Sequence, residues 1–223
     1  MFSNESYIMS SGVILSRKIF GENTYYITLF IKQYGIMNAT ASSHSYSGDK
    51  EPLIWAKFKL RKKSWSRNYF IEDTDITEDM LALRKSREQI LTALKWCRLI
   101  TKYLEPSRPD DELLANLYWN MKLLADITVP FYAADWRFLR RWLSIWGLAP
   151  EYKSFLARNR FTDDEIMILS FVAQSDTKRV IEFFSRHKDI PAEIFMRALD
   201  LSARLLNVKW DYIFYDFYET IKP

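Results

Sequence analysis

The sequence predicts an α+β protein in which a small β domain, residues 1–75, precedes an all-α helical domain, residues 76–223. In the first part, β-branched and aromatic residues occur in short runs separated by turn residues. From Thr77 onward, apolar residues recur with the period of an α-helix, about 3.6 residues. The charge changes at the same place, because residues 1–70 hold ten basic and four acidic residues whereas residues 71–223 hold 22 basic and 24 acidic ones.

Five runs in the first domain have the composition of β-strands. The turn residues of segments 21–23 and 33–35 separate the first three of them. Five strands without a long helix among them are typical of a small closed or half-closed barrel, and the OB-fold is its commonest five-stranded form. The predicted strands are residues 7–16, 23–31, 36–41, 53–61 and 68–73.

The fourth predicted strand carries the clearest functional signal. Alternation places Ala56, Phe58 and Leu60 on a core face, so that the intervening side chains lie on an exposed face. Cations neutralise phosphates and aromatic rings stack on unpaired bases, so a mixture of the two favours nucleic-acid binding. A solvated strand face whose lysines protect a sheet edge is the alternative. The predicted DNA-binding residues here are Trp55, Lys57, Lys59, Arg61, Lys62, Lys63, Trp65 and Arg67.

Seven helices are predicted after residue 76, at residues 79–104, from Ser107, from Pro130 to Gly147, and at 151–157, 162–173, 177–186 and 192–206. Ser107 is the expected N-cap of the second, and a capping box opens the helix at residue 162. Cys97 falls on an apolar face and is expected to be a small buried hydrophobe. The aromatic segment 210–218 either packs on the bundle or binds a partner.

The composition excludes several kinds of functional site. One cysteine cannot form an internal disulfide or a multi-thiolate zinc site, and two histidines leave little for a histidine-based metal centre. Five glycines, with neither a G-x-x-x-x-G-K nor a G-x-G-x-x-G motif, argue against a phosphate-binding loop. The acidic runs 110–112 and 163–165 lie at predicted helix starts, where acids stabilise the helix end. We therefore expect no catalytic residues, no metal and no cofactor.

The chain is expected to be a soluble, cytoplasmic protein without membrane contact. No run approaches the ~18 apolar residues that span a bilayer. The N-terminus also lacks the basic and apolar regions of a signal peptide.

Several short motifs resemble the RecO family of DNA recombination and repair mediators. Residues 12–15 (Gly-Val-Ile-Leu), 20–23 (Phe-Gly-Glu-Asn), 28–30 (Thr-Leu-Phe) and 33–36 (Gln-Tyr-Gly-Ile) resemble the strands and turns with which that family opens. Residues 136–150, which end in Gly-Leu-Ala-Pro, resemble the end of one of its helices. The order of the two domains is also similar.

The resemblance implies a function and a set of partners. RecO proteins bind single- and double-stranded DNA, anneal complementary strands, load the recombinase and have no catalytic residues. They cooperate with RecR and bind the acidic C-terminal tail of the single-stranded-DNA-binding protein. The similarity thus implies a cytoplasmic, nucleoid-associated protein in which residues 57–67, with Arg17 and Lys18, contact DNA. Arg137, Arg140 and Arg141 form a basic helix face that either receives the acidic tail or is simply solvated.

The chain departs from the family at two loops. Many RecO proteins carry four zinc-binding cysteines soon after the Gly-x-x-Pro segment, whereas residues 151–160 contain none. The loop after the third strand is serine-rich and holds Lys50 as its single cation. A non-catalytic protein-interaction adaptor with an OB-like domain is the alternative function, and an enzyme whose site is not visible in the sequence is the weakest one.

Overall fold

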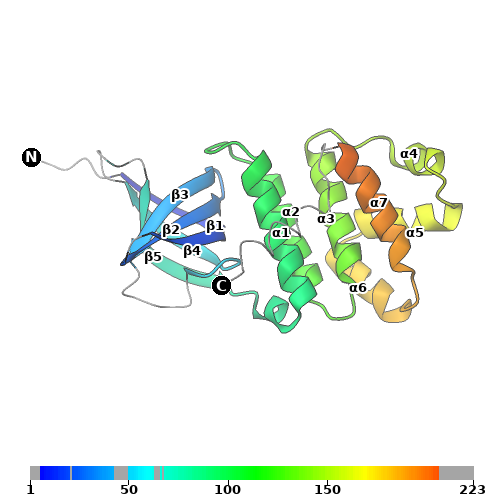
Figure 1. Cartoon of the computed structure of the whole chain (residues 1–223), viewed down its shortest axis with the longest axis horizontal. Helices are drawn as coiled ribbons and strands as arrows, with labels where there is room; N and C mark the ends of the chain where they lie inside the picture. The colour runs from blue at the N-terminus through cyan, green and yellow to red at the C-terminus, as the bar shows by residue number, and fades with distance from the viewer. Residues whose placement is uncertain (1–5, 21, 43–49, 63–65, 67, 206–223) are drawn as a thin grey trace, which may run out of the picture. The chain divides into compact units, whose positions relative to one another are not determined.

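The computed structural model describes residues 6–20, 22–42, 50–62, 66 and 68–205. Five strands are followed by helices, which confirms the predicted α+β class (Figure 1). The strands are β1 (Ser6–Phe20), β2 (Thr24–Ile31), β3 (Gly35–Ser42), β4 (Trp55–Lys62) and β5 (Tyr69–Glu78). A short 3-10 helix, η2 (Leu81–Lys85), precedes α1 (Arg87–Tyr103), α2 (Asp111–Leu124), α3 (Phe131–Ile145), α4 (Tyr152–Arg158), α5 (Asp163–Gln174), α6 (Thr177–Arg186) and α7 (Ala192–Leu205).

The chain divides into two compact units. The first consists of Met1–Lys85 and Trp96–Leu114, and the second of Ser86–Lys95 and Ala115–Pro223. Strand β5 continues through residue 75 to Glu78, and the first unit also takes in parts of α1 and α2. The structural unit that carries the barrel is therefore larger than its strands.

The five strands close into a barrel in the order β1-β2-β3-β5-β4. The long strand β1 makes this possible, because residues 12–20 pair with β2 while residues 6–13 pair with β4. A short parallel pairing of β3 with β5, at Ala39↔Tyr69 and Thr40↔Phe70, completes the ring. A small barrel of five strands is OB-like in its architecture.

Aliphatic and aromatic side chains that point inward from all five strands fill the barrel. The predicted core stripe of β4 is confirmed, because Ala56, Phe58 and Leu60 are fully buried. Ile27 and Leu29 of β2 join them in the same cluster. The side chains between these inward-facing ones therefore face outward, and they form the outer surface of the barrel.

The turn between β2 and β3 is joined to the segment before α2, within the first unit. Gly35 has a positive φ of 75°, and a Cβ atom there would lie 2.1 Å from the carbonyl oxygen of Arg108. The backbone N–H of Ser107 donates to the Ile36 carbonyl (3.0 Å), and that of Gln33 donates to Asp111 Oδ1 (2.7 Å). Glycine is therefore required at position 35 by both conformation and space.

The predicted start of α2 is wrong by several residues. Ser107 is not its N-cap, since this residue has a positive φ of 60° and its N–H is bonded to β3. Asp110 takes the role, accepting a hydrogen bond from the N–H of Leu113 (2.9 Å) through Oδ1. Preference for serine at an N-cap was outweighed by a tertiary hydrogen bond that the local sequence does not reveal.

The first predicted helix is interrupted. Instead of one helix over residues 79–104, the chain forms η2 and then α1, with a positive φ of 51° at Met80. Cys97 of α1 is buried as predicted, and burial raises the pKa of its thiol to about 12. This thiol is therefore a packing group and not a nucleophile at neutral pH.

The second unit is built around α3, which has α7 and α5 beside it (Figure 1). The predicted capping box of α5 is confirmed, since Thr162 and Glu165 each accept a hydrogen bond from the other's backbone N–H. Among the described residues, no helix has the length and apolar character needed to cross a membrane. The aromatic segment 210–218 lies outside the described residues.

Candidate nucleic-acid interface

Strand β4 holds four of the predicted cations in differing environments: Lys57, Lys59 and Arg61 face outward, whereas Lys62 follows the core residues Phe58 and Leu60 in the alternation. Lys57 and Lys59 are exposed, and Arg61 and Lys62 are half-buried. Lys62 lies over the ring of Tyr69 (Nζ 5.2 Å from its centroid). The structure therefore brings these four cations together on one strand. Lys63, Trp65 and Arg67 lie outside the described residues.

Trp55 was predicted to be an exposed stacking residue, and this is wrong. It is 8% exposed, because it belongs to a row of outward-facing residues that is covered. The row runs from Trp55 through Val13 and Phe30 to Ile36, each paired with the next across neighbouring strands, and all four are buried. At its far end, Ile36 is bridged to Pro106 of the same compact unit. Strand alternation gives the side of the sheet but does not show that other residues cover that side.

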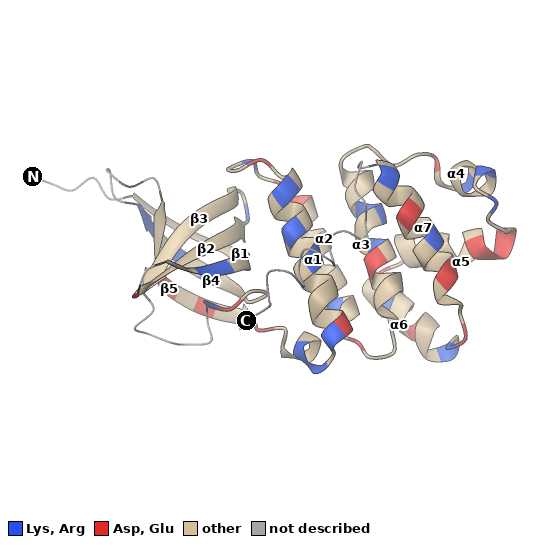
Figure 2. Ribbon diagram, in the orientation of Figure 1, with Lys and Arg blue, Asp and Glu red and all other residues tan. Residues whose placement is uncertain are grey.

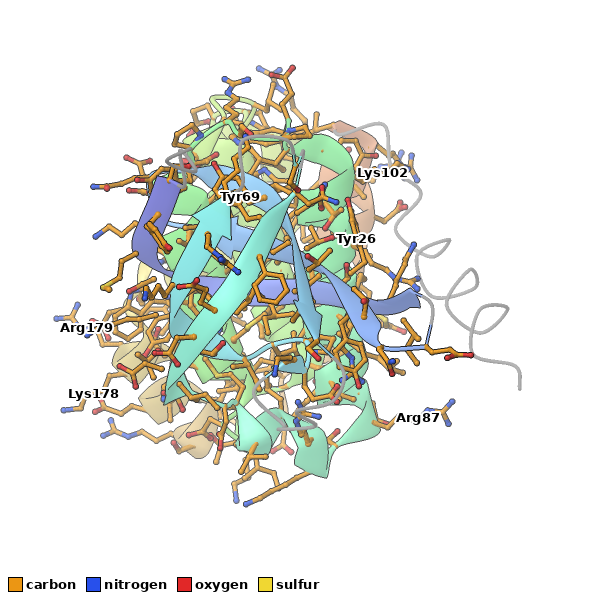
Figure 3. The ribbon with its side chains drawn as sticks, turned by 90° about the vertical axis from the view of Figure 1, so that its left-hand side faces the viewer. Tyr26, Tyr69, Arg87, Lys102, Lys178 and Arg179 are labelled. Carbon is orange, nitrogen blue, oxygen red and sulfur yellow. The ribbon has the colours of Figure 1, made fainter. Side chains whose placement is uncertain are left out.

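A second row of outward residues encircles the barrel and is accessible. Strand pairing places Tyr7 beside Arg61, Arg61 beside Phe70, Phe70 beside Thr40, Thr40 beside Tyr26, and Tyr26 beside Lys18. Tyr7 is 52% exposed and Phe70 37% exposed. We call this row the outer band: Lys18, Tyr26, Thr40, Phe70, Arg61 and Tyr7. Figure 3 shows Tyr26 on β2 and Tyr69 on β5 among the side chains of the barrel.

Cations and rings are adjacent within and beside the outer band. The Arg61 guanidinium carbon lies 5.7 Å from the centre of the Phe70 ring, and Lys59 Nζ lies 5.5 Å from that of Tyr7. Both distances are in the range of cation–π attraction. Sequence reasoning missed Tyr7, Tyr26 and Phe70, because only the register between strands places them next to the cations.

Arg17 differs from Lys18, its neighbour on β1. Its side chain forms an ion pair with Glu51 (2.9 Å) and lies 4.7 Å from the centre of the Tyr25 ring, which is buried in the barrel core. Lys18 is exposed and belongs to the outer band. Of the two predicted contacts, Lys18 is therefore the better placed to meet a phosphate.

Acidic residues on β5 reduce the positive charge of the barrel. Glu72 pairs with both Lys59 (3.1 Å) and Arg61 (2.9 Å), and Asp73 and Asp75 lie opposite Lys59 and Lys57 in the register. Figure 2 shows basic β4 and acidic β5 side by side. Up to the end of β5, residues 1–78 hold ten basic and eight acidic residues. The excess of cations predicted for residues 1–70 thus depended on ending the count before these acids.

The basic face predicted for α3 is also wrong, because its arginines serve the helical unit itself. Arg137 is 1% exposed and donates to Asn120 Oδ1 and to the Ser175 carbonyl (both 3.0 Å). Arg141 donates to the carbonyls of Ala173 (3.0 Å) and Ser175 (2.9 Å), at the end of α5.

Arg140 completes this set, donating to the Pro150 carbonyl (3.3 Å) and lying over the ring of Tyr152. Burial lowers the pKa of all three guanidinium groups, for Arg137 to about 9. Spacing placed the three on one helix face but could not show that this face is packed inside the unit. None of them is assigned to an acidic peptide tail.

The remaining polar clusters have structural partners. Asp110 and Glu165 cap helices, as expected of acidic runs at helix starts, and His187 follows the end of α6 with its ring 4.7 Å from that of Phe183. In the part of the chain that the structure describes, no group of three or more His, Cys, Asp and Glu side chains is arranged to hold a metal ion. No protein-family model matches the chain, and no curated protein matches it either.

Proposed function

We propose that this chain is a non-enzymatic DNA-binding protein whose barrel holds single-stranded DNA along the outer band. The observation that carries the proposal is the row of rings and cations around the barrel: Tyr7, Arg61, Phe70, Thr40, Tyr26 and Lys18 follow one another through successive strand pairings. The band includes Tyr26 of β2 and Thr40 of β3, and OB-folds commonly use the face of these two strands to bind oligonucleotides.

The chemistry of this arrangement suits a single strand. Each cation that meets a phosphate releases a condensed counterion, and each ring that stacks on a base contributes about 1–3 kcal/mol. Neither interaction depends on base identity, so the expected binding is sequence-tolerant. The expected affinity is moderate, because the β5 acids offset much of the positive charge next to the band.

The wider role that we propose is that of a RecO-like recombination mediator. It would also bind double-stranded DNA, promote annealing, assist recombinase loading and act with RecR and the acidic tail of the single-stranded-DNA-binding protein, in association with the nucleoid. This part of the proposal is supported by the motif resemblance together with the order of the two domains. It assigns no residue to the acidic tail.

Fluorescence anisotropy with a labelled single-stranded oligonucleotide, titrated at several salt concentrations, tests the proposal. The logarithm of affinity should fall with the logarithm of salt concentration by about 0.7 for each phosphate contacted. Replacing Tyr26 and Phe70 by alanine should weaken binding at every salt concentration, whereas replacing Lys18 and Arg61 should also flatten the slope. A chain that binds no oligonucleotide at low salt contradicts the proposal.

A matched control is available on α6. Lys178 and Arg179 are exposed cations of the helical unit and are labelled in Figure 3. Replacing both by alanine removes the same charge as the Lys18 and Arg61 replacements. Equal losses of affinity in the two double variants would show attraction by net charge alone and would refute the outer band.

The rival function, a protein-interaction adaptor, is favoured by one observation. Met9 and Ile19 of β1 are 76% and 75% exposed, so the barrel also presents apolar side chains to a partner. An adaptor would bind oligonucleotide weakly, and its binding would be insensitive to the loss of the Tyr26 and Phe70 rings. The titrations described above therefore separate the two functions.

A further inference from the structure

A β-bulge on β5 places one carboxylate between two cations of β4. In the register of the two strands, Lys59 faces Asp73 and Leu60 faces Ile71, so Glu72 is an extra residue on β5. Bulges bend a strand and redirect a side chain, and they are common at binding sites. Here the redirected side chain is that of Glu72, which lies on the outer surface of the barrel beside the outer band.

The Glu72 carboxylate uses its two oxygens separately. Oε2 lies 3.1 Å from Lys59 Nζ, and Oε1 lies 2.9 Å from Arg61 Nε. The side chains of Lys59, Arg61 and Glu72 are 45%, 26% and 23% exposed, so the group lies at the surface and is partly exposed to solvent. An ammonium and a guanidinium bind the oxygens of a phosphate as well as those of a carboxylate, so Glu72 occupies a position that suits a backbone phosphate.

We propose that Glu72 is an internal counter-anion that occupies the phosphate position between Lys59 and Arg61 and is displaced when DNA binds. This inference rests on the proposed function and goes beyond it by naming a residue that limits affinity. Solvent-exposed ion pairs are weak, so a polyanion with many phosphates can replace the carboxylate. The neighbouring rings of Tyr7 and Phe70 remain in place to accept bases when the carboxylate leaves.

The consequence is a barrel that binds DNA less tightly than its cations alone would allow. Removing the charge of Glu72 should therefore tighten binding, the opposite of what is expected for a residue that contacts DNA directly. When DNA no longer has to break these two exposed ion pairs, its affinity at low salt should rise about three- to tenfold. The salt dependence should steepen by about 0.7 if one more phosphate contact forms.

The test compares Glu72→Gln with a control of equal charge. Glu182 is an exposed residue of α6, and Glu182→Gln changes the net charge by the same amount in the helical unit. Anisotropy titrations with the same single-stranded oligonucleotide are made on the full chain and on both variants. The inference predicts the gain for Glu72→Gln and little change for Glu182→Gln, whereas equal effects of the two substitutions overturn it.

A double-mutant cycle locates the effect. In a chain that carries Lys59→Met and Arg61→Met, Glu72 has no cations to occupy, so Glu72→Gln should no longer tighten binding. If that substitution still tightens binding there, the carboxylate acts by general repulsion and the inference fails. If Lys59→Met and Arg61→Met weaken binding while Glu72→Gln alone has no effect, Glu72 is not a competitor but the DNA-binding function stands.

A measurement on the unaltered protein covers the case in which Glu72→Gln fails to fold. Arg61 Nε lies 2.9 Å from Glu72 Oε1, so the NMR resonance of the Arg61 Nε–H proton reports on this ion pair. Saturating oligonucleotide should shift this resonance while leaving that of Arg179 unchanged. An unmoved Arg61 resonance in a protein that binds the oligonucleotide overturns the inference alone. Absence of binding at low salt overturns both the inference and the proposed function.

Discussion

Replacing Gly35 by alanine should disrupt the junction between the β2–β3 turn and the backbone of Arg108. Two separate costs act there. A positive φ of 75° costs an L-residue about 1–2 kcal/mol. A Cβ atom would also lie 2.1 Å from the Arg108 oxygen and 2.5 Å from its carbonyl carbon, so backbone must move. Such overpacking costs about 1–3 kcal/mol, which brings the total to about 2–5 kcal/mol.

Gly147 provides a control that isolates the second cost. It has a similar φ of 68°, but a Cβ atom there would meet nothing within 4 Å. Gly147→Ala should therefore cost only the conformational part, about 1–2 kcal/mol, less a few tenths regained from the unfolded chain. Urea unfolding followed by circular dichroism gives both values.

Hydrogen exchange provides a local reading of the same substitution. The N–H groups of Gln33 and Ser107 bond across this junction, so both should exchange faster in Gly35→Ala and stay protected in Gly147→Ala. Equal destabilisation by the two substitutions, with Ser107 still protected, would refute the packing argument for Gly35.

Three further predictions concern buried groups of the helices. Lys95 and Asp135 form an ion pair that is almost fully buried, so Lys95→Met should lower the free energy of unfolding by about 3–5 kcal/mol, and adding Asp135→Leu should restore part of that loss in urea unfolding. Arg137→Lys should cost about 1–3 kcal/mol in the same assay, because one ammonium cannot reach both acceptors that the guanidinium bonds; full stability would contradict this role. Cys97 has a thiol pKa raised to about 12 by burial, so iodoacetamide should label it only after unfolding. The folded-state pKa of this thiol exceeds that of the unfolded chain, so its contribution to the free energy of unfolding is complete below about pH 9 and should be lost as the pH rises toward 12. Urea unfolding at several pH values measures this loss.

Local patterns were sufficient to predict most of the elements. Alternation in β4 identified Ala56, Phe58 and Leu60 as core residues, because a strand's two faces follow from its geometry alone. The capping box at Thr162 and the span of α6 were also correct, since both depend on residues that are close together in the sequence. Such features need no knowledge of distant parts of the chain.

The errors share a different physical origin. Trp55, Arg137 and Ser107 each lie where a local pattern predicted exposure or a cap, yet residues distant in sequence cover or bond them. The outer band was missed for the same reason, because Tyr7 and Phe70 become neighbours of Arg61 only when strands pair in register. Both the covering of a face and the register of strands are decided by tertiary structure.

The contrast between Arg61 and Arg137 shows how burial decides what an arginine can do. Arg61 keeps its guanidinium partly in water, with an acid and a ring beside it, so a phosphate can exchange for the acid with little loss of solvation. Arg137 has its donors directed to an amide oxygen and a carbonyl in the interior, and removing them would leave buried acceptors without hydrogen bonds. An anionic ligand can therefore compete for the first residue but not for the second. Any acidic partner of the helical unit must accordingly be sought at exposed cations, such as Lys178 of α6, and not on α3.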